Sequence, residues 1–392
     1  MISVTEAKAL ISEQIKLLNP IPLALIESSG HILAEDVYAQ YNIPAFRQSA
    51  MDGYAVIYDD HAQALKLVGE MAAGTSNTLH IESGETARIF TGAPLPEGAD
   101  TVVMQEKVKI SEGKIQIEDQ QLNLGSNVRP IGSEIKSGEL AMPAGSLLSP
   151  AAIGFLAGIG ITEVKVFPMP EVAIIVTGKE LQKPGSVLDF GQIYESNSYS
   201  LSAALKSEGI TSIEILQADD DLIILTSILQ AALIKNDVVL LTGGVSVGDY
   251  DFVLEASKRC GVRQIFHKVK QKPGKPLFFG TKGDQLVFGL PGNPSSVLNC
   301  YYNYVLPAIK KLSNKENSVR EITATLTHRY EKTAGLTHFL KGVYTDAKVT
   351  PLHAQESFRL SSFAQANCLI CLDETQQEFA VGEKVNILLL PQ

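Results

Sequence analysis

The sequence predicts a multidomain α/β protein in which one domain is a doubly wound, mostly parallel sheet. From Glu171 onward, short apolar runs rich in β-branched residues alternate with segments of helical periodicity. Such alternation requires a mostly parallel sheet with helices packed on both faces. A chain of 392 residues is also too long for one ordinary hydrophobic core, which predicts two to four domains.

The N-terminal part, residues 1–45 together with 125–170, is predicted to form a discontinuous helical linker domain. Residues 5–18 carry apolar side chains at helical spacing and end at Asn19-Pro20. Ser149-Pro150 is typical of an N-cap followed by proline in the first turn. The apolar stretch 151–161 is about half of the roughly 20 residues that a membrane span requires, so we expect a buried helix there.

Between these two segments, residues 46–124 are predicted to form an inserted β-rich domain. The sequence changes here to short β runs separated by glycine turns. Three of these predicted strands cover residues 87–90, 101–104 and 114–117.

Residues 171–315 are predicted to form the α/β domain. The expected strands are 172–176, 213–216, 237–240 and 286–290, and the expected helices are 199–207, 222–234, 252–260 and 295–312. Asn293 is placed as the N-cap of the last helix, with Pro294 as its first residue.

A polar linker, residues 314–321, leads into a C-terminal β-barrel-like domain at residues 316–392. Its expected strands are 323–326, 339–344, 368–372 and 385–390. Cys368 and Cys371 form a lone CxxC within one of them. Without a second cysteine pair or nearby histidines, core packing is favoured over zinc binding.

Charge and cysteine content restrict the class of protein. A formal net charge of −10 argues against non-specific nucleic-acid binding, which needs a basic face. The N-terminus lacks the basic start and apolar block of a signal peptide, and four cysteines do not suggest a disulfide framework. We therefore expect a cytoplasmic protein that binds neither nucleic acid nor membrane.

A glycine-containing loop at residues 241–251 follows the predicted strand 237–240 and precedes a helix. Open α/β sheets present their ligands at this kind of junction. The loop is neither a Walker A loop nor a GxGxxG motif. The glycines of the loop, among them Gly243 and Gly244, allow an anion close to the backbone, while Asp249 and Asp251 repel one. This conflict suggests a metal ion between protein and ligand.

Five acids occupy loop or helix-start positions: Asp52, Glu134, Glu180, Asp220 and Asp251. Each alone is most simply a solvated carboxylate. Two carboxylates about 5 Å apart repel by roughly 3 kcal/mol at an effective dielectric near 20, so a cluster requires a cation, and oxygen ligands favour Mg²⁺.

The stretch from Lys268 to Pro276 is cationic in an otherwise acidic protein, and proline and glycine fix the spacing between its Lys272 and Lys275. It is either a solvated surface loop or a pair of fixed charges that face phosphate or another oxyanion. Together, acids and lysines suggest a Mg²⁺-dependent enzyme acting on a phosphorylated ligand.

Six segments of the chain resemble the molybdopterin molybdenumtransferases of molybdenum-cofactor biosynthesis, which are related to the E domain of gephyrin. In order along the chain, these segments are SAMDGYAV (49–56), GEMAAG (69–74), TGAPLP (91–96), LTGGVSVG (241–248), KPGKP (272–276) and GLPGNP (289–294). Together they span residues 49–294 of the sequence.

The resemblance implies four domains and an elongated homodimer. Its implied cleft lies between the α/β domain of one subunit and N-terminal parts of the other. It also implies a reaction in which molybdenum from molybdate enters adenylylated molybdopterin, with Mg²⁺-dependent release of AMP. A molybdopterin adenylyltransferase is the implied protein partner.

Residue by residue, the resemblance implies the following site. The catalytic candidates are Asp52, Glu180, Asp251, Lys272 and Lys275. The substrate-binding candidates are Thr91, Asp220, Gly243, Gly244, Ser246, Pro291, Pro294 and Ser357. The implied metal ligands are Asp251, Asp220 and Glu134.

The chain departs from the family pattern at several positions. Glu134 replaces a usual aspartate, Lys179 replaces a usual acid, and Lys341 replaces a usual arginine, whose bidentate contacts lysine cannot reproduce. A non-catalytic pterin-binding or scaffold protein, as in gephyrin, is the main alternative. A nucleotide hydrolase that shares only the α/β domain is a second alternative, which the SAMDGYAV and GEMAAG segments outside that domain disfavour.

Overall fold

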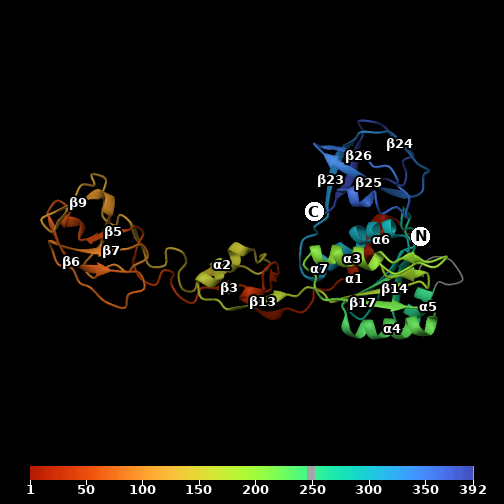
Figure 1. The fold of residues 1–392 in the computed structure, drawn as a ribbon, viewed down its shortest axis with the longest axis horizontal. Coiled ribbons are helices and arrows are strands. Elements are labelled where there is room, and N and C mark those ends of the chain that lie inside the picture. Colours follow the sequence, from red (N-terminus) through yellow and green to blue (C-terminus); the bar gives the residue numbers. More distant parts are fainter. Residues whose placement is uncertain (245–251, 392) are drawn as a thin grey trace. The chain divides into compact units, whose positions relative to one another are not determined.

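The computed structural model describes residues 1–244 and 252–391 of the chain (Figure 1). The chain forms two compact units. The first consists of Met1–Ile21, Gly30–Ile32 and Val166–Gln392, and the second of Pro22–Ser29 and Leu33–Lys165. Among the helices that the structure describes, none has the length and apolar character needed to cross a membrane.

A six-stranded sheet forms the centre of the first unit, in the order β17-β14-β18-β22-β21-β19. The first four strands are mutually parallel, β21 pairs antiparallel with β22, and β19 pairs antiparallel with β21. The bounds are β14 Val172–Thr177, β17 Ile213–Ala218, β18 Val238–Thr242, β19 Arg263–His267, β21 Phe278–Lys282 and β22 Gln285–Leu290. This sheet confirms the predicted mostly parallel arrangement, although β19 and β21 were not predicted.

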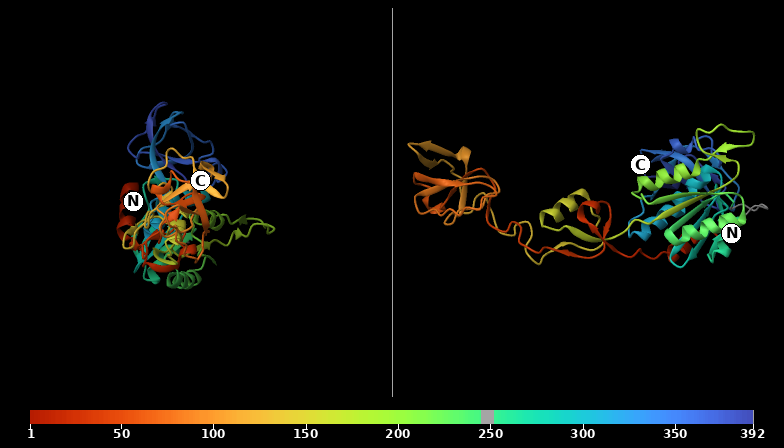
Figure 2. Two further views of the ribbon diagram at one scale, coloured as in Figure 1. Left: turned by 90° about the vertical axis from the view of Figure 1, so that its left-hand side faces the viewer. Right: turned by 60° about the horizontal axis from the view of Figure 1, so that its bottom comes forward.

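Helices cover both faces of this sheet (Figure 2). Consecutive residues of β14 enter different cores, since Ile174 packs with one apolar cluster and Ile175 with the other. This alternation follows from the two-residue period of a strand. The first cluster includes residues of α1 (Val4–Gln14), α3 (Asn197–Ser207), α6 (Pro294–Cys300) and α7 (Leu306–Leu312), and the second includes residues of α4 (Leu222–Lys235) and α5 (Phe252–Arg259). The doubly wound prediction is confirmed.

The predicted helix 295–312 is divided into three segments. α6 passes into a π-helical turn, η4 (Tyr301–Val305), and then into α7. Asn293 occupies the N-cap position and Pro294 lies in the first turn, as predicted. The Asn293 side chain, however, makes no capping hydrogen bond. Its amide instead contacts a distant loop of the pocket described below.

The C-terminal part of the chain forms a closed five-stranded sheet. Strands β25-β26-β23-β29-β27 pair in this order, and β27 pairs back onto β25, which confirms the barrel-like prediction. Their bounds are β23 Arg320–Leu326, β25 Thr337–Thr345, β26 Lys348–Pro351, β27 Cys368–Leu372 and β29 Lys384–Leu389. Cys368 is buried in β27, where burial raises the pKa of its thiol to about 12, as expected for a core residue.

The second unit contains a six-stranded sheet in the order β8-β5-β7-β6-β10-β9. Its bounds are β5 Gly53–Val56, β6 Leu65–Met71, β7 Glu85–Ile89, β8 Thr101–Met104, β9 Val108–Ser111 and β10 Lys114–Ile117. The same unit contains α2 (Pro150–Gly158), where the Ser149 hydroxyl accepts a hydrogen bond from the Ala152 amide as predicted. The division of the chain into four domains at 45, 125, 170 and 315 stays a prediction.

Candidate functional site

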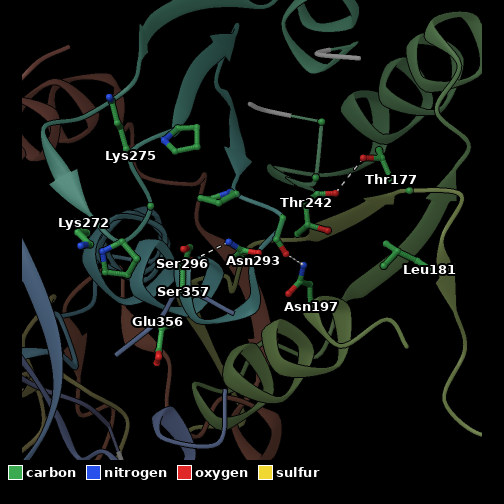
Figure 3. Close-up of a pocket in the computed structure, with 18 of the residues that line it drawn as sticks. Thr177, Leu181, Asn197, Thr242, Lys272, Lys275, Asn293, Ser296, Glu356 and Ser357 are labelled. Carbon is green, nitrogen blue, oxygen red and sulfur yellow. Dashed lines mark hydrogen bonds between the residues drawn. The ribbon is translucent and has the colours of Figure 1, made fainter. Parts of the chain in front are cut away.

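A pocket of about 770 Å³ lies in the first unit, where the parallel strands of the large sheet end (Figure 3). Thr177 at the end of β14, Thr242 at the end of β18 and Pro291 directly after β22 all line it. The Thr177 hydroxyl donates a hydrogen bond to the Thr242 carbonyl at 3.3 Å. Ligands of open α/β sheets bind at this edge because the loops of neighbouring strands diverge there.

Gly243 and Gly244 follow β18 and form part of the pocket wall. Both have a positive φ, of 88° and 62°. A Cβ at Gly243 would lie 2.7 Å from the Thr177 carbonyl oxygen and 2.8 Å from its hydroxyl. Gly243 is therefore required both by its backbone conformation and by the close approach of β14.

Lys272 and Lys275 line the same pocket from the stretch that contains β20 (Gln271–Lys272). Both side chains are exposed, and neither makes a salt bridge within residues 1–244 and 252–391. β20 pairs with β25, which places Lys272 opposite His338. Lys272 thus extends from a paired strand and Lys275 from the residues directly after it, and both charges are available to an anion.

Two of the predicted carboxylates, Glu180 and Asp220, line the pocket. The Lys179 amide donates to Asp220 Oδ2 at a long distance of 3.4 Å. In the part of the chain that the structure describes, no three His, Cys, Asp or Glu side chains form a group that could hold a metal ion. Asp251 and Ser246, which were predicted beside them, lie outside the described residues.

The C-terminal β domain contributes a loop with Gln355, Glu356 and Ser357 to the pocket. The Asn293 amide nitrogen donates to the Ser357 hydroxyl at 2.8 Å (Figure 3), and the Ser295 backbone N–H donates to the Ser357 carbonyl at 3.1 Å. These two bonds connect the start of α6 to this loop.

Lys341, the residue that replaces the usual arginine, is only 2 % exposed. Its ammonium group donates to the carbonyls of Ala354 at 2.8 Å, Arg359 at 3.1 Å and Glu356 at 3.4 Å. Burial lowers the pKa of this amine. Lys341 therefore stabilises the backbone of the loop that presents Ser357.

Asp52 and Thr91 are brought together in the second unit. Asp52 Oδ1 accepts hydrogen bonds from the Thr91 amide and hydroxyl, each at 2.8 Å. These bonds, with a smaller contribution from the Arg88 charge, lower the pKa of the exposed Asp52 carboxyl. Glu134 lines a separate hollow of that unit with Arg129.

Several pocket residues were missed by the sequence analysis, above all Asn197 and Gln271. Asn197 is 7 % exposed, and its amide nitrogen donates to the Gly292 carbonyl at 2.8 Å. Its Oδ1 is buried without a partner among the described residues. The predicted helix began at residue 199, so the N-terminal position of Asn197 in α3 was not recognised. Pro294 begins α6 beside the pocket, and Pro291 lines it.

Three family models match the chain. The MoeA N-terminal region (domain I and II) matches residues 2–160, the probable molybdopterin binding domain matches residues 173–311, and the MoeA C-terminal region (domain IV) matches residues 323–390. Together these matches extend over nearly the whole chain.

Individual proteins match at full length. The molybdopterin molybdenumtransferase of Haemophilus influenzae is 33% identical over 401 residues, which covers 99% of this chain and 98% of that protein. The protein of the same name from Staphylococcus aureus strain Mu50 is 34% identical over 400 residues, covering 99% and 95%.

The fold also matches a solved structure. A crystal structure of a molybdopterin biosynthesis MoeA protein from Pyrococcus horikoshii superposes with a TM-score of 0.82 at 29% identity, covering 99% of each chain.

Proposed function

The chain belongs to the molybdopterin molybdenumtransferase family, and we propose that it inserts molybdenum from molybdate into adenylylated molybdopterin with Mg²⁺-dependent release of AMP. The observation that supports this activity most directly is the exposed pair Lys272 and Lys275 at the pocket of the parallel sheet. A protein with a net charge of −10 needs such local positive charge to bind an anionic substrate.

In this proposal, the pocket residues bind and orient the substrates. Lys272 and Lys275 neutralise phosphate and molybdate oxygens as point charges. Gly243 and Gly244 present backbone to the pocket in a positive-φ conformation, and Ser357 offers its hydroxyl from the neighbouring loop. Pro291 and Pro294 limit the flexibility of the backbone beside them, because proline fixes φ.

The donor set of the pocket fits Mg²⁺. This ion is usually bound through one or two carboxylates, substrate phosphates and water, and Asp220 and Glu180 supply two carboxylates. We assign Asp220 as a ligand, together with Asp251, which lies outside the described residues. When bound, Mg²⁺ would stabilise the charge that develops on the departing AMP phosphate.

We further propose that the protein is a homodimer and receives its pterin from a molybdopterin adenylyltransferase. Asp52 and Thr91 then act on the pocket of the neighbouring subunit. Glu134, as the third proposed metal ligand, would also come from the N-terminal parts. The family resemblance is the basis of these assignments.

The test is AMP release from adenylylated molybdopterin by the purified protein. AMP, measured by chromatography, should form only when molybdate and Mg²⁺ are both present, and a chelator should abolish it. AMP no higher than in a protein-free control would contradict the enzyme. If the protein then still bound molybdopterin, the non-catalytic pterin-binding alternative would replace it.

A further inference from the structure

A buried polar cluster connects the lysine stretch in the pocket wall to the π-helical turn. Gln271 is fully buried, and its side chain contacts both Gly274 and Tyr304. Gln271 Nε2 donates to the Gly274 carbonyl at 2.8 Å, while its Oε1 accepts the Tyr304 hydroxyl. One amide thus connects the backbone between the two lysines to the helix behind it.

Neighbouring residues hold the same stretch of backbone. The Asn299 amide nitrogen donates to the Pro273 carbonyl at 3.2 Å, and the Val269 amide donates to the Lys275 carbonyl at 3.0 Å. At Gly274, a Cβ would lie 2.7 Å from the sulfur of Cys300 and 3.0 Å from Gln271 Nε2. The peptide carbonyls of Pro273, Gly274 and Lys275 therefore each accept a hydrogen bond.

The π-helical turn places the tyrosine of this cluster. A π turn widens the helix by one residue and is frequent at functional sites. Tyr301 and Tyr304, which both belong to this turn, are fully or almost fully buried. The two tyrosines differ in the hydrogen bonding of their hydroxyl groups. That of Tyr304 bonds Gln271, whereas that of Tyr301 has no partner among the described residues.

We infer that Gln271, Tyr304 and Asn299 are positioning residues that hold the backbone of Lys272 and Lys275 in the geometry that grips an anionic substrate. The inference rests on the proposed function, since the lysines must bind that substrate. The flexible lysine side chains make no salt bridge with any described residue, so their shared backbone is what restricts where their charges lie. A shift of about 1 Å at such groups can cost on the order of 100-fold in rate.

The experiment compares Tyr304→Phe with Tyr301→Phe. Each variant removes one buried tyrosine hydroxyl from the same turn, but only the first removes a bond to Gln271. Hydrogen exchange should become about tenfold faster at the Val269 amide in Tyr304→Phe, because local opening becomes easier. In AMP-release kinetics, the same variant should raise the KM for adenylylated molybdopterin about tenfold, with a smaller change in kcat. Tyr301→Phe should match the wild type in both measurements.

Unchanged exchange and KM in Tyr304→Phe, with only a lower Tm, would overturn the inference, since the cluster would then stabilise the core alone. If Tyr304→Phe does not fold, Asn299→Ala removes a single donor to Pro273 and should shift both measurements in the same direction. A wild-type protein that releases no AMP would refute the proposed function, while hydrogen exchange would still test the positioning of the lysine backbone.

Discussion

At the scale of single residues, Gly243 is a pocket position where a side chain does not fit, and Gly261 outside the pocket is a comparison for it. Gly243 and Gly261 both have a positive φ, of 88° and 75°. They differ in their surroundings, because a Cβ at Gly243 would meet Thr177 at 2.7 Å, whereas nothing lies within 4 Å of one at Gly261. The pair separates the cost of backbone strain from the cost of a steric clash.

We expect Gly243→Ala to lower the free energy of unfolding by about 1–3 kcal/mol more than Gly261→Ala does. Both alanines strain the backbone, but only the first pushes β18 away from β14. Urea denaturation of the two variants measures the difference. Equal losses of unfolding free energy in the two variants would show that β14 moves away from the new methyl group without destabilising the protein.

At the scale of elements, the sequence predicted the helices and the four parallel strands of the large sheet, but fewer than half of all the strands that the structure describes. Strands β8, β10 and β27 have the predicted bounds, because their apolar runs are short and bounded by turn residues. β19 and β21 were missed, because their sequences, RQIFH and FFGTK, carry no clean two-residue alternation. They form strands through pairing with each other and with β22, which depends on tertiary structure.

The break in the helix after α6 has a cause in the sequence. Pro307 has no amide hydrogen and cannot bond the carbonyl of Asn303, so the ladder of hydrogen bonds is interrupted there. Pro307 therefore indicated an irregularity in this helix, although the predicted helix 295–312 was continuous. Pocket residues such as Asn197 were harder to find, since its partner Gly292 is 95 residues away.

Strand β25 carries a buried histidine with consequences for stability. His338 is 5 % exposed, and burial, with contributions from Lys272 and Lys332, lowers its pKa to about 4. The unfolded chain has the ordinary value of 6.5, so between these values the unfolded state binds more protons than the folded state. Stability should then rise with pH through this window.

The predicted size of this effect is about 3 kcal/mol between pH 4 and 7. Urea unfolding at several pH values should show a weaker pH dependence in His338→Leu than in the wild type, since only the wild type has a buried group to protonate. The comparison cancels the carboxylates that both proteins share. Identical pH profiles for the variant and the wild type would mean that the pKa of His338 is the same in the folded and unfolded states.

At the scale of the whole molecule, the predicted site residues fall into two sets. Lys272, Lys275 and Ser357 line one pocket of the first unit, while Asp52 and Thr91 bond each other in the second. The sequence motifs contain Asp52, Thr91, Lys272 and Lys275, whereas Ser357 lies outside the six motif segments. Which chain supplies each set to an active site is a matter of assembly, and a mixture of variants can test it.

In the proposed homodimer, Asp52 of one subunit serves the lysine pocket of the other. Asp52→Ala and Lys275→Ala should each have low activity alone. When the two variants exchange subunits, half of the dimers are mixed and each mixed dimer has one intact site, so activity should recover to about a quarter of the wild-type value. A mixture of Asp52→Ala with Thr91→Ala is the matched control. It should recover nothing, because both losses fall in the same unit and leave every site defective. Recovery no greater than in this control would mean that Asp52 does not act across subunits.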